Sequence, residues 1–275
     1  MLGPMTSPDV QSSHTFVVPA FGEPPWLERC VASIQRQTVR SSMLITTSTP
    51  NSHVQSVAER LRVPLVVNPR AQGIASDWNF ALAQARTQWV TLAHQDDWYE
   101  QDYTEACLDA VTPNAGGAIL VFTGATETLD GRGGTLLNTR VKRAISGSVF
   151  GPTESITSSW RKRLLLSFGN PIPCPSAMIN LSAAADFRFP DGWKSNLDWS
   201  AWYELAQRPG AFVYVARRLV HRTMHAGAET TNALADRARE DARMFRMLWP
   251  APIAVALNLL YSPSRHLYSA LRGER

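Results

Sequence analysis

The chain alternates between short apolar runs and segments in which apolar residues recur every three or four positions. Four buried strands are predicted from the apolar runs, over residues 14–19, 43–47, 64–67 and 89–93. Four helices are predicted from the spaced stripes, over residues 27–34, 54–61, 74–85 and 103–110. Strands that alternate with helices in this order predict an α/β fold with a parallel sheet covered by helices on both faces.

The regular alternation ends near residue 112. Beyond the apolar run 118–123, a glycine-rich loop, a basic stretch and the proline-punctuated segment 170–175 replace it. A further helix is predicted there, with a buried stripe of Leu197, Ala201, Trp202 and Leu205. The second half of the chain is therefore expected to be less regular than the first.

The C-terminal segment combines apolar stripes with basic residues. Apolar positions from Leu234 to Leu248 keep helical spacing, and the apolar run 251–260 leads into a basic stretch. From Asp236 to Arg275 there are seven arginines and four acidic residues. This composition suits a helix that lies on an anionic membrane surface, but docking on the rest of the chain or on a second subunit explains it equally well.

Composition narrows the class of protein. With 275 residues, of which 44% are hydrophobic, the chain can bury a substantial core. A net charge of +4 suits a phosphorylated ligand or an anionic membrane, and no nucleic-acid-binding motif is present, so no nucleic-acid partner is expected. Three widely spaced cysteines argue against a disulfide framework and a zinc knuckle. Residues 1–13 do not resemble a signal peptide and no apolar run is long enough to span a bilayer, so a cytoplasmic protein is expected.

Two adjacent carboxylates, Asp96 and Asp97, follow the predicted strand 89–93. At the carboxyl edge of a parallel sheet, where α/β folds bind ligands, such hard oxygen ligands suit Mg²⁺ or Mn²⁺ bridged to a diphosphate. The alternative is that both are solvated turn residues that cap the next helix.

Four segments stand in an order that resembles a known family. They are Val17-Val18-Pro19-Ala20-Phe21, the helical segment 27–38, the segment from Asn68 to Ala81, and His94-Gln95-Asp96-Asp97. Together they resemble the inverting family 2 glycosyltransferases of bacterial surface-polysaccharide synthesis, over about residues 14–249. The resemblance implies a GT-A fold, in which a Rossmann-like, mostly parallel sheet is flanked by helices.

The same resemblance divides the chain into regions. It implies a flexible tail over 1–13, a nucleotide-sugar-binding half over 14–111, an acceptor-binding and catalytic half over 112–231, and a helical tail over 232–275. The tail is the part expected to contact a membrane surface or a second copy in a homo-oligomer. In the first case the protein would be peripheral at the inner face of the cytoplasmic membrane.

The resemblance also implies the reaction. A sugar would move from a nucleoside-diphosphate sugar, of the UDP or dTDP type, to a hydroxyl of a glycan or lipid-linked acceptor. Inverting transfer needs a cation, Mn²⁺ or Mg²⁺, for the departing diphosphate and one carboxylate to take the proton of the hydroxyl. By resemblance Asp97 ligates the metal, Asp96 shares it or holds the ribose, and His225 completes the metal sphere or contacts the diphosphate.

By resemblance, Asp198 is the predicted catalytic base, because the base of the family precedes a helix in the second half. Its place near the positive amino end of the predicted helix favours ionisation. The alternative is that Asp198 caps that helix, and both roles can hold together. Asp191 and Glu204 are the next candidates.

The donor-binding residues are predicted mainly at the carboxyl ends of the first strands. The set is Pro19, Phe21, Thr47, Ser48, Asn68, Gly73, Asn79, Gln95 and, from the second half, Arg222 as a forked cation for phosphate oxygens. Most relatives carry Asp-Asp-Gly-Ser after the second strand, whereas this chain has Thr46-Thr47-Ser48-Thr49-Pro50-Asn51. The departure leaves the nucleobase open, and Asp77 either compensates or is a surface carboxylate.

The acceptor-binding residues are predicted around the metal and the base. Cys174 and Ser176 lie where relatives contact the acceptor, and no nucleophilic thiolate is required in an inverting displacement. Three tryptophans flank the two carboxylate sites and are expected to stack on sugar rings, namely Trp98, Trp193 and Trp199. Trp78 and Trp202 lie on apolar helix stripes and are expected to pack in the core.

Two other functions fit parts of the sequence. A non-catalytic nucleotide-sugar-binding or partner subunit of a glycosyltransferase complex is suggested by the missing acids after the second strand, but the joint presence of Asp96, Asp97 and Asp198 argues against it. A nucleotidyltransferase would need a glycine-rich, arginine-bearing loop after the first strand, where this chain has Ala20-Phe21-Gly22-Glu23-Pro24.

Overall fold

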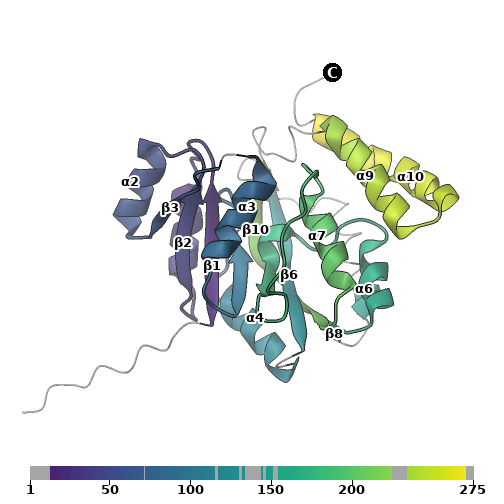
Figure 1. The fold of residues 1–275 in the computed structure, drawn as a ribbon, viewed down its shortest axis with the longest axis horizontal. Coiled ribbons are helices and arrows are strands. Elements are labelled where there is room, and N and C mark those ends of the chain that lie inside the picture. The colour runs from purple at the N-terminus through teal and green to yellow at the C-terminus, as the bar shows by residue number, and fades with distance from the viewer. Residues whose placement is uncertain are drawn as a thin grey trace, which may run out of the picture.

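A ten-stranded mixed sheet runs through the protein, with strand order β3-β2-β1-β4-β9-β6-β10-β5 (Figure 1). The two short strands β7 and β8 pair with β6 and β10. The computed structural model describes residues 13–70, 72–114, 117–129, 132–133, 144, 147–150, 154–224 and 234–270. The tail predicted over 1–13 lies, apart from Ser13, outside these residues.

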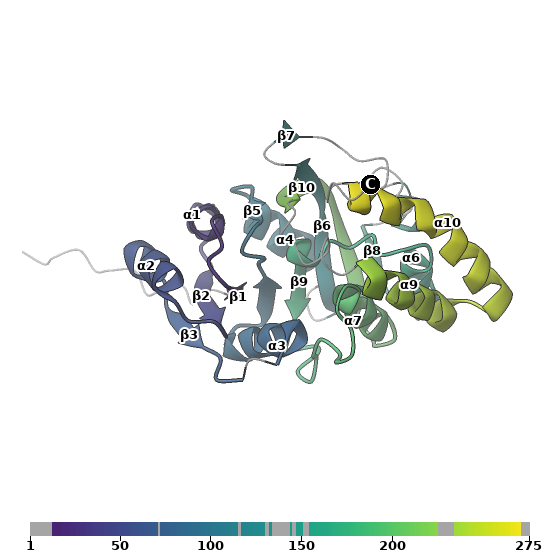
Figure 2. The same cartoon turned by 90° about the horizontal axis from the view of Figure 1, so that it is seen from above.

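The four predicted βα units are confirmed. The strands are β1 (His14–Ala20), β2 (Ser42–Thr47), β3 (Leu65–Val67) and β4 (Trp89–Leu92), all paired in parallel. The helices are α1 (Leu27–Gln35), α2 (Ser52–Leu61), α3 (Ile74–Gln84) and α4 (Tyr103–Val111). Strand β1 is buried on both faces, since Val17 belongs to the core that α3 covers and Phe16 and Val18 to the core that α1 covers. Figure 2 shows α1 and α3 on opposite sides of the sheet.

The second half is built on three further strands of the same sheet. They are β6 (Ala118–Leu129), β9 (Ala177–Asn180) and β10 (Ala211–Met224). Strand β9 runs antiparallel between β4 and β6, whereas β10 runs parallel to β6. The short pieces are β5 (Trp98–Tyr99), β7 (Arg132–Gly133), β8 (Ser155–Ile156), and the 3₁₀ turns η1 (Thr112–Asn114) and η2 (Cys174–Ser176). Most paired residues lie in parallel registers, as predicted for a mostly parallel sheet.

Strand β10 could not be predicted from alternation. Its pairing with β6 shifts register around Arg218, between Val215 and Val220, so its apolar positions lose their period of two. Helix α6 (Ser159–Leu166) was also not predicted, because its sequence carries three consecutive basic residues. The predicted helix of the second half is α7 (Leu197–Ala206), in which Trp202 is fully buried as expected.

The predicted helical tail is confirmed as α9 (Leu234–Leu248) and α10 (Ala251–Ala270). Helix α9 docks on the rest of the chain, since Met244 and Phe245 are fully buried and the Phe245 ring lies 5.4 Å from that of Trp199. Helix α10 packs on α9, with Ala254 1% exposed. Within the residues described, neither these helices nor any other combine the length and apolar character that a bilayer crossing requires.

Candidate active site

Asp96 and Asp97 lie in a tight turn between β4 and β5, at the carboxyl end of the parallel strands. The turn closes through the Asp97 backbone N–H, which donates to the His94 carbonyl at 3.1 Å. Strand β5 then pairs with the far part of β10. The turn is therefore anchored on both sides by the sheet, and the N-cap residue of the next helix, α4, is Asp102 rather than either carboxylate.

Asp97 is buried, with 3% of its surface exposed, and its carboxylate is held by neighbouring groups. Its Oδ1 accepts a hydrogen bond from the Thr223 backbone N–H at 3.0 Å, and its Oδ2 lies 3.6 Å from His94 Nδ1. Burial, followed by the neighbouring Asp96 charge, raises the pKa of Asp97, while Arg222 and the Thr223 N–H oppose the shift. A buried carboxylate beside a second, half-buried one favours a positive partner.

His94 supplies a third ligand atom to the same turn. Burial lowers the pKa of His94 to about 4, so the imidazole is neutral near pH 7. Its Nε2 is buried and has no hydrogen-bond partner among the described residues. The candidate ligand atoms of His94, Asp96 and Asp97 lie within 4.8 Å of one another. A neutral imidazole and two carboxylates are a donor set that fits a divalent cation.

The sequence reasoning named Asp96 and Asp97 for the metal but not His94. The signal was present, because His94 stands two residues before Asp96 in the same motif. His225, the third metal ligand predicted, lies outside the described residues.

Asp198, the predicted base, is the second residue of α7. Its Oδ1 accepts from the Trp199 backbone N–H at 2.7 Å, and its Oδ2 accepts from Asn170 Nδ2 at 2.8 Å. Asn170 is fixed in turn, because its Oδ1 accepts from the Ile172 N–H at 3.1 Å. The carboxylate is thus oriented by the proline-punctuated segment as well as by its own helix.

The entry to α7 is held by acidic side chains of α9, which sequence reasoning did not find. Glu240 accepts hydrogen bonds from the backbone N–H groups of Lys194, Ser195 and Asn196, at 2.7 to 2.9 Å. The buried Asp241 accepts from Asn196 Nδ2 at 2.8 Å. The C-terminal tail therefore positions the segment that carries Asp198.

The thiol of Cys174 is buried, and charged side chains from distant parts of the chain act on its pKa. Burial and then the charge of Asp198 raise the pKa of the Cys174 thiol, Arg222 lowers it, and Asp97 raises it. The thiol is consequently protonated and fits no nucleophilic role. A further acid, Glu127 of β6, accepts from Arg222 Nη1 at 3.1 Å. No motif marks Glu127, so the sequence offered no way to find it.

The loops after β1, β2 and β4 are tied together by side chains. Gln95 Oε1 accepts from the Phe21 N–H at 2.8 Å, and the Thr49 hydroxyl accepts from the Gly22 N–H at 2.8 Å. Phe21 is 64% exposed beside the half-buried Pro19. Of the predicted donor-binding residues, Pro19, Phe21 and Gln95 therefore share one end of the sheet.

Asp77 of α3 reaches the loop after β2. Its Oδ2 accepts from the Ser48 hydroxyl and its Oδ1 from Asn68 Nδ2, each at 2.8 Å. Thr47 beside it is 2% exposed, and its hydroxyl accepts from the Thr49 N–H. Asp77 thus brings a carboxylate to a loop whose own sequence has none.

Two other predicted donor residues have structural duties. Gly73, the residue before α3, has φ +95°, a conformation that favours glycine. Asn79 bonds the backbone of Phe189 twice, with its Nδ2 donating at 2.9 Å and its Oδ1 accepting at 2.8 Å. These contacts clamp α3 against the segment before α7.

The predicted acceptor residues are placed unequally. Trp98 is sandwiched, with the His221 ring stacked at 3.5 Å and the Arg29 guanidinium 4.6 Å from its centroid, and its buried Nε1 has no partner among the described residues. Trp199 is 1% exposed and donates through Nε1 to the Leu166 carbonyl. Ser176 is fully buried and donates to the Pro173 carbonyl. Neither Trp98 nor Trp199 offers a free ring face to a sugar.

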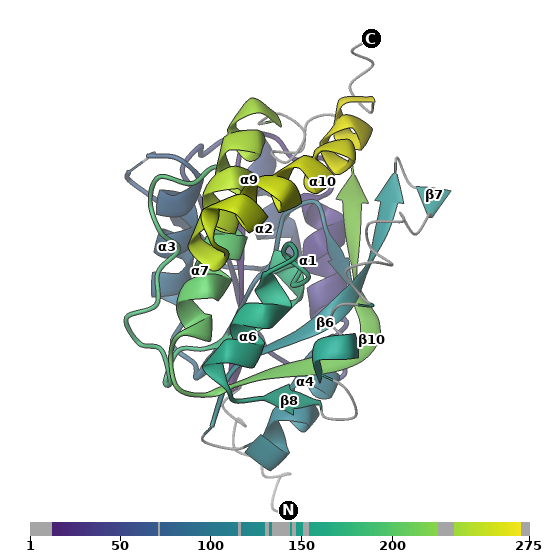
Figure 3. The ribbon, with the colours of Figure 1, turned by 90° about the vertical axis from the view of Figure 1, so that its right-hand side faces the viewer.

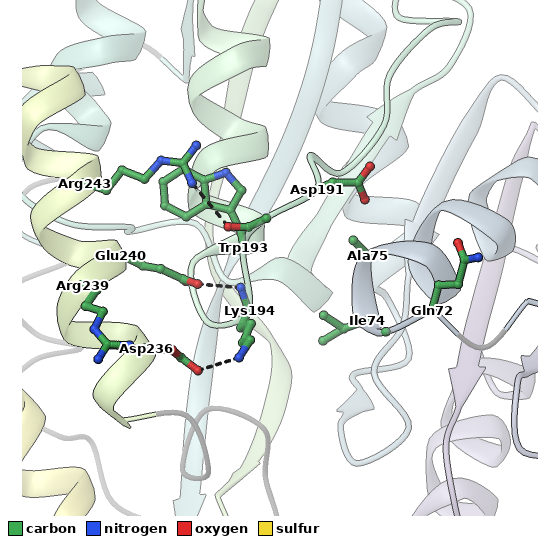
Figure 4. A pocket seen from close by; sticks show the side chains of 12 residues that line it. Gln72, Ile74, Ala75, Asp191, Trp193, Lys194, Asp236, Arg239, Glu240 and Arg243 are labelled. Atoms are coloured by element: carbon green, nitrogen blue, oxygen red, sulfur yellow. Dashed lines mark hydrogen bonds and ion pairs between the residues drawn. The ribbon is translucent and has the colours of Figure 1, made fainter.

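Trp193 borders a cavity of about 490 Å³ between α3, the loop 191–194 and α9 (Figure 4). The Arg243 guanidinium lies 4.1 Å from the centroid of the Trp193 ring. Lys194 donates to Asp236 at 2.9 Å on the α9 side. Aromatic, acidic and basic side chains line this cavity, namely Asp191, Trp193, Lys194, Asp236, Arg239, Glu240 and Arg243.

Comparisons with known proteins agree with this geometry. The sequence profile of glycosyl transferase family 2 matches residues 15–174. The chain has no significant sequence match among proteins with curated descriptions. Its structure is similar to that of S. aureus TarS 1–349 in complex with UDP-GlcNAc, with a TM-score of 0.61, 14% identity, and coverage of 95% of this chain and 74% of that one.

A second solved structure gives a similar match. The mannosyltransferase PcManGT from Pyrobaculum calidifontis, in complex with GDP-Man and Mn²⁺, has a TM-score of 0.62 and 13% identity, with coverage of 95% of this chain and 75% of that one. A longer TarS structure has a TM-score of 0.58 and 14% identity over 89% of this chain, which spans only 42% of that one.

Proposed function

The chain belongs to glycosyl transferase family 2 and has the predicted GT-A fold, and from that premise we propose an inverting, metal-dependent transfer of a sugar. The donor is a nucleoside-diphosphate sugar, and the acceptor is a hydroxyl of a glycan or lipid-linked acceptor used in cell-surface polysaccharide synthesis. The observation that carries the proposal is the turn after β4, in which the candidate ligand atoms of His94, Asp96 and Asp97 lie within 4.8 Å of one another.

The proposed displacement needs one base and one cationic site. The Asp198 carboxylate takes the proton of the acceptor hydroxyl as its oxygen attacks the anomeric carbon. The bond from that carbon to the diphosphate breaks, and the diphosphate leaves with the electron pair. Arg222 offers two donors to the departing phosphate oxygens. When bound by His94, Asp96 and Asp97, with His225 as a further ligand, Mn²⁺ or Mg²⁺ would neutralise the diphosphate.

The positions of the aromatic residues refine the acceptor proposal. Asp191 borders the cavity, and Trp193 forms part of its wall although it is only 5% exposed and contacts Arg243, so we assign sugar binding to this cavity rather than to stacking on Trp193. Trp98 has both ring faces covered and its Nε1 is buried, so we do not assign it a contact with the sugar. Trp199 and Ser176 are buried among protein atoms and are left out of the acceptor set.

Asp77 supports a donor with a base that presents an N–H group. A carboxylate accepts hydrogen bonds at about four lone-pair positions, and Asp77 uses two of them on Ser48 and Asn68. The ring N–H of uracil or thymine can be accepted by a remaining position, whereas cytosine presents an acceptor there. The lack of acids in the loop after β2 suggested a non-catalytic subunit. Asp77 of α3 supplies a carboxylate beside this loop.

Calorimetry with UDP, dTDP and CDP in the presence of Mn²⁺ tests the donor proposal. Wild-type protein is expected to bind UDP or dTDP more tightly than CDP. Asp77→Asn should reduce that preference by roughly 10- to 100-fold, since one hydrogen bond to a charged group contributes about 1.5–3 kcal/mol. Asp186→Asn is the matched control, because its exposed carboxylate pairs with Arg208 on another surface.

The transferase function and the role of Asp77 can be contradicted separately. If no nucleoside diphosphate binds the wild-type protein, the transferase function is contradicted. If UDP binds and Asp77→Asn keeps the wild-type preference over CDP, only the role of Asp77 is contradicted.

A further inference from the structure

The exposed apolar side chains of this protein gather on one side. Nine large hydrophobic residues are exposed among those the structure describes, and two of them, Phe21 and Val67, lie near the donor end of the sheet. The other seven lie in or just after α6, in α9 and in α10: Trp160, Phe168, Met247, Ile253, Val255, Leu259 and Leu260. Figure 3 shows these three helices on the same side of the molecule. We call this the α6–α10 surface.

Contacts of Trp249 join the end of α6 to the turn between α9 and α10. The Phe168 ring, just after α6, lies 5.5 Å from the Trp249 ring in the turn between α9 and α10. Trp249 is anchored by its Nε1, which donates to the Ser167 carbonyl at 2.8 Å. Helix α10 turns Ala254 toward α9 and leaves Leu259 and Leu260 68% and 77% exposed. Over residues 251–260, the exposed side chains of α10 are therefore mainly apolar, while Ala254 is already packed.

Exposing these apolar side chains to water is unfavourable, which indicates that a partner covers them. Single exposed apolar residues are ordinary, but a gathered set is typical of an interaction surface. Burying one leucine or isoleucine contributes roughly 1.5–3 kcal/mol. Several such residues on one side would bind an apolar phase firmly.

The charges around the surface select the kind of partner. No aspartate or glutamate occurs in residues 155–185 or 242–273, which contain α6 and α10. Arg163 and Arg246 are exposed on α6 and α9. The acids of α9 are used elsewhere, since Glu240 and Asp241 bond the entry to α7. The surface thus combines apolar and aromatic residues with arginines, which is the composition that binds anionic membrane interfaces.

We propose that the α6–α10 surface docks the protein on an anionic lipid bilayer. A second copy of the chain is a poorer occupant, because self-pairing of this surface would bring its own arginines together. Helix α9 also lines the cavity beside Trp193, so a docked protein holds that cavity near the lipid headgroups. This last point rests on the proposed transferase function and identifies the acceptor as lipid-linked.

Vesicle binding tests the proposal without any activity measurement. Wild-type protein should co-sediment with vesicles of phosphatidylcholine mixed with phosphatidylglycerol, more weakly with phosphatidylcholine alone, and less in high salt. Leu259→Gln with Leu260→Gln should lower the partition coefficient at least about tenfold. The melting temperature should not change, because both side chains are exposed. Val67→Thr removes an exposed apolar side chain outside the surface and should bind as wild type.

Three results would overturn the docking proposal. They are wild-type protein that stays in the supernatant with anionic vesicles, a double variant that sediments as wild type does, and a wild-type dimer that the double variant converts to monomer without any vesicle binding. If vesicles are bound but no nucleoside diphosphate is, docking stands and the transferase function fails.

Discussion

Replacing Asp198 by asparagine is expected to lower kcat by about 10²- to 10⁴-fold, the contribution typical of a general base. Donor affinity should change little, because the carboxamide is nearly isosteric and the metal-binding turn is untouched. The Trp199 N–H can still be accepted by the asparagine oxygen. The bond from Asn170 Nδ2 is lost, since two amino groups would then face each other, and the melting temperature should fall by about 2–4 °C.

Asn170→Ala distinguishes the loss of the Asp198 carboxylate from the loss of the hydrogen bond that orients it. This variant removes the same hydrogen bond, and also the acceptor of the Ile172 N–H, but keeps the Asp198 carboxylate. Its loss of stability should therefore be at least as large and its loss of kcat much smaller. The two variants are compared by kcat and by melting temperature under the same conditions. A folded Asp198→Asn protein with near wild-type kcat would show that Asp198 only caps α7. Asp191, at the cavity, would then be the first alternative base, ahead of Glu204.

Replacing Asp97 by asparagine is expected to abolish transfer and to weaken Mn²⁺-dependent binding of UDP by roughly 100-fold or more, since even residues behind the metal ligands contribute 10- to 100-fold to metal affinity. The fold should survive. Asparagine can still accept from the Thr223 N–H, and removing a buried charge beside Asp96 relieves an unfavourable interaction.

The measurement is calorimetry with UDP, with Mn²⁺ and with a chelator. In the presence of the chelator, wild-type protein and Asp97→Asn should bind UDP with similar affinity. The Asp97 carboxylate, in which they differ, then has no metal ion to bind. Asp186→Asn again controls for the loss of one negative charge. Unchanged Mn²⁺-dependent affinity in Asp97→Asn would remove Asp97 from the metal site.

Much of the fold could be predicted because it is encoded locally. The strand β1 and the helix α1 follow from runs and periods that a short window of sequence contains, and their bounds agree with the structure within one or two residues. The position of the turn that carries Asp96 and Asp97 could be predicted for the same reason, because both residues directly follow a buried strand.

In the second half of the chain, β10 and α6 could not be predicted, because tertiary contacts stabilise them and their sequences lack the usual periodic pattern. The pairing of β10 with β6 shifts around Arg218, so its residues do not alternate as a strand should. Helix α6 is basic along its middle, yet Lys162 is fully buried and donates to the carbonyls of Arg208 and Gly210. A buried lysine satisfied by distant carbonyls leaves no periodic signal.

The sequence by itself determined the βα alternation, the helical tail and the placing of carboxylates after β4 and at the start of α7. Only the tertiary structure decided that the Thr223 N–H donates to Asp97, that Asp77 reaches Ser48, and that Glu240 holds the entry to α7. The physical reason is the distance along the chain over which each kind of interaction acts. Hydrophobic period and turn chemistry act over a few residues, whereas these contacts join residues from separate elements, and the packing of the whole core fixes where those elements meet.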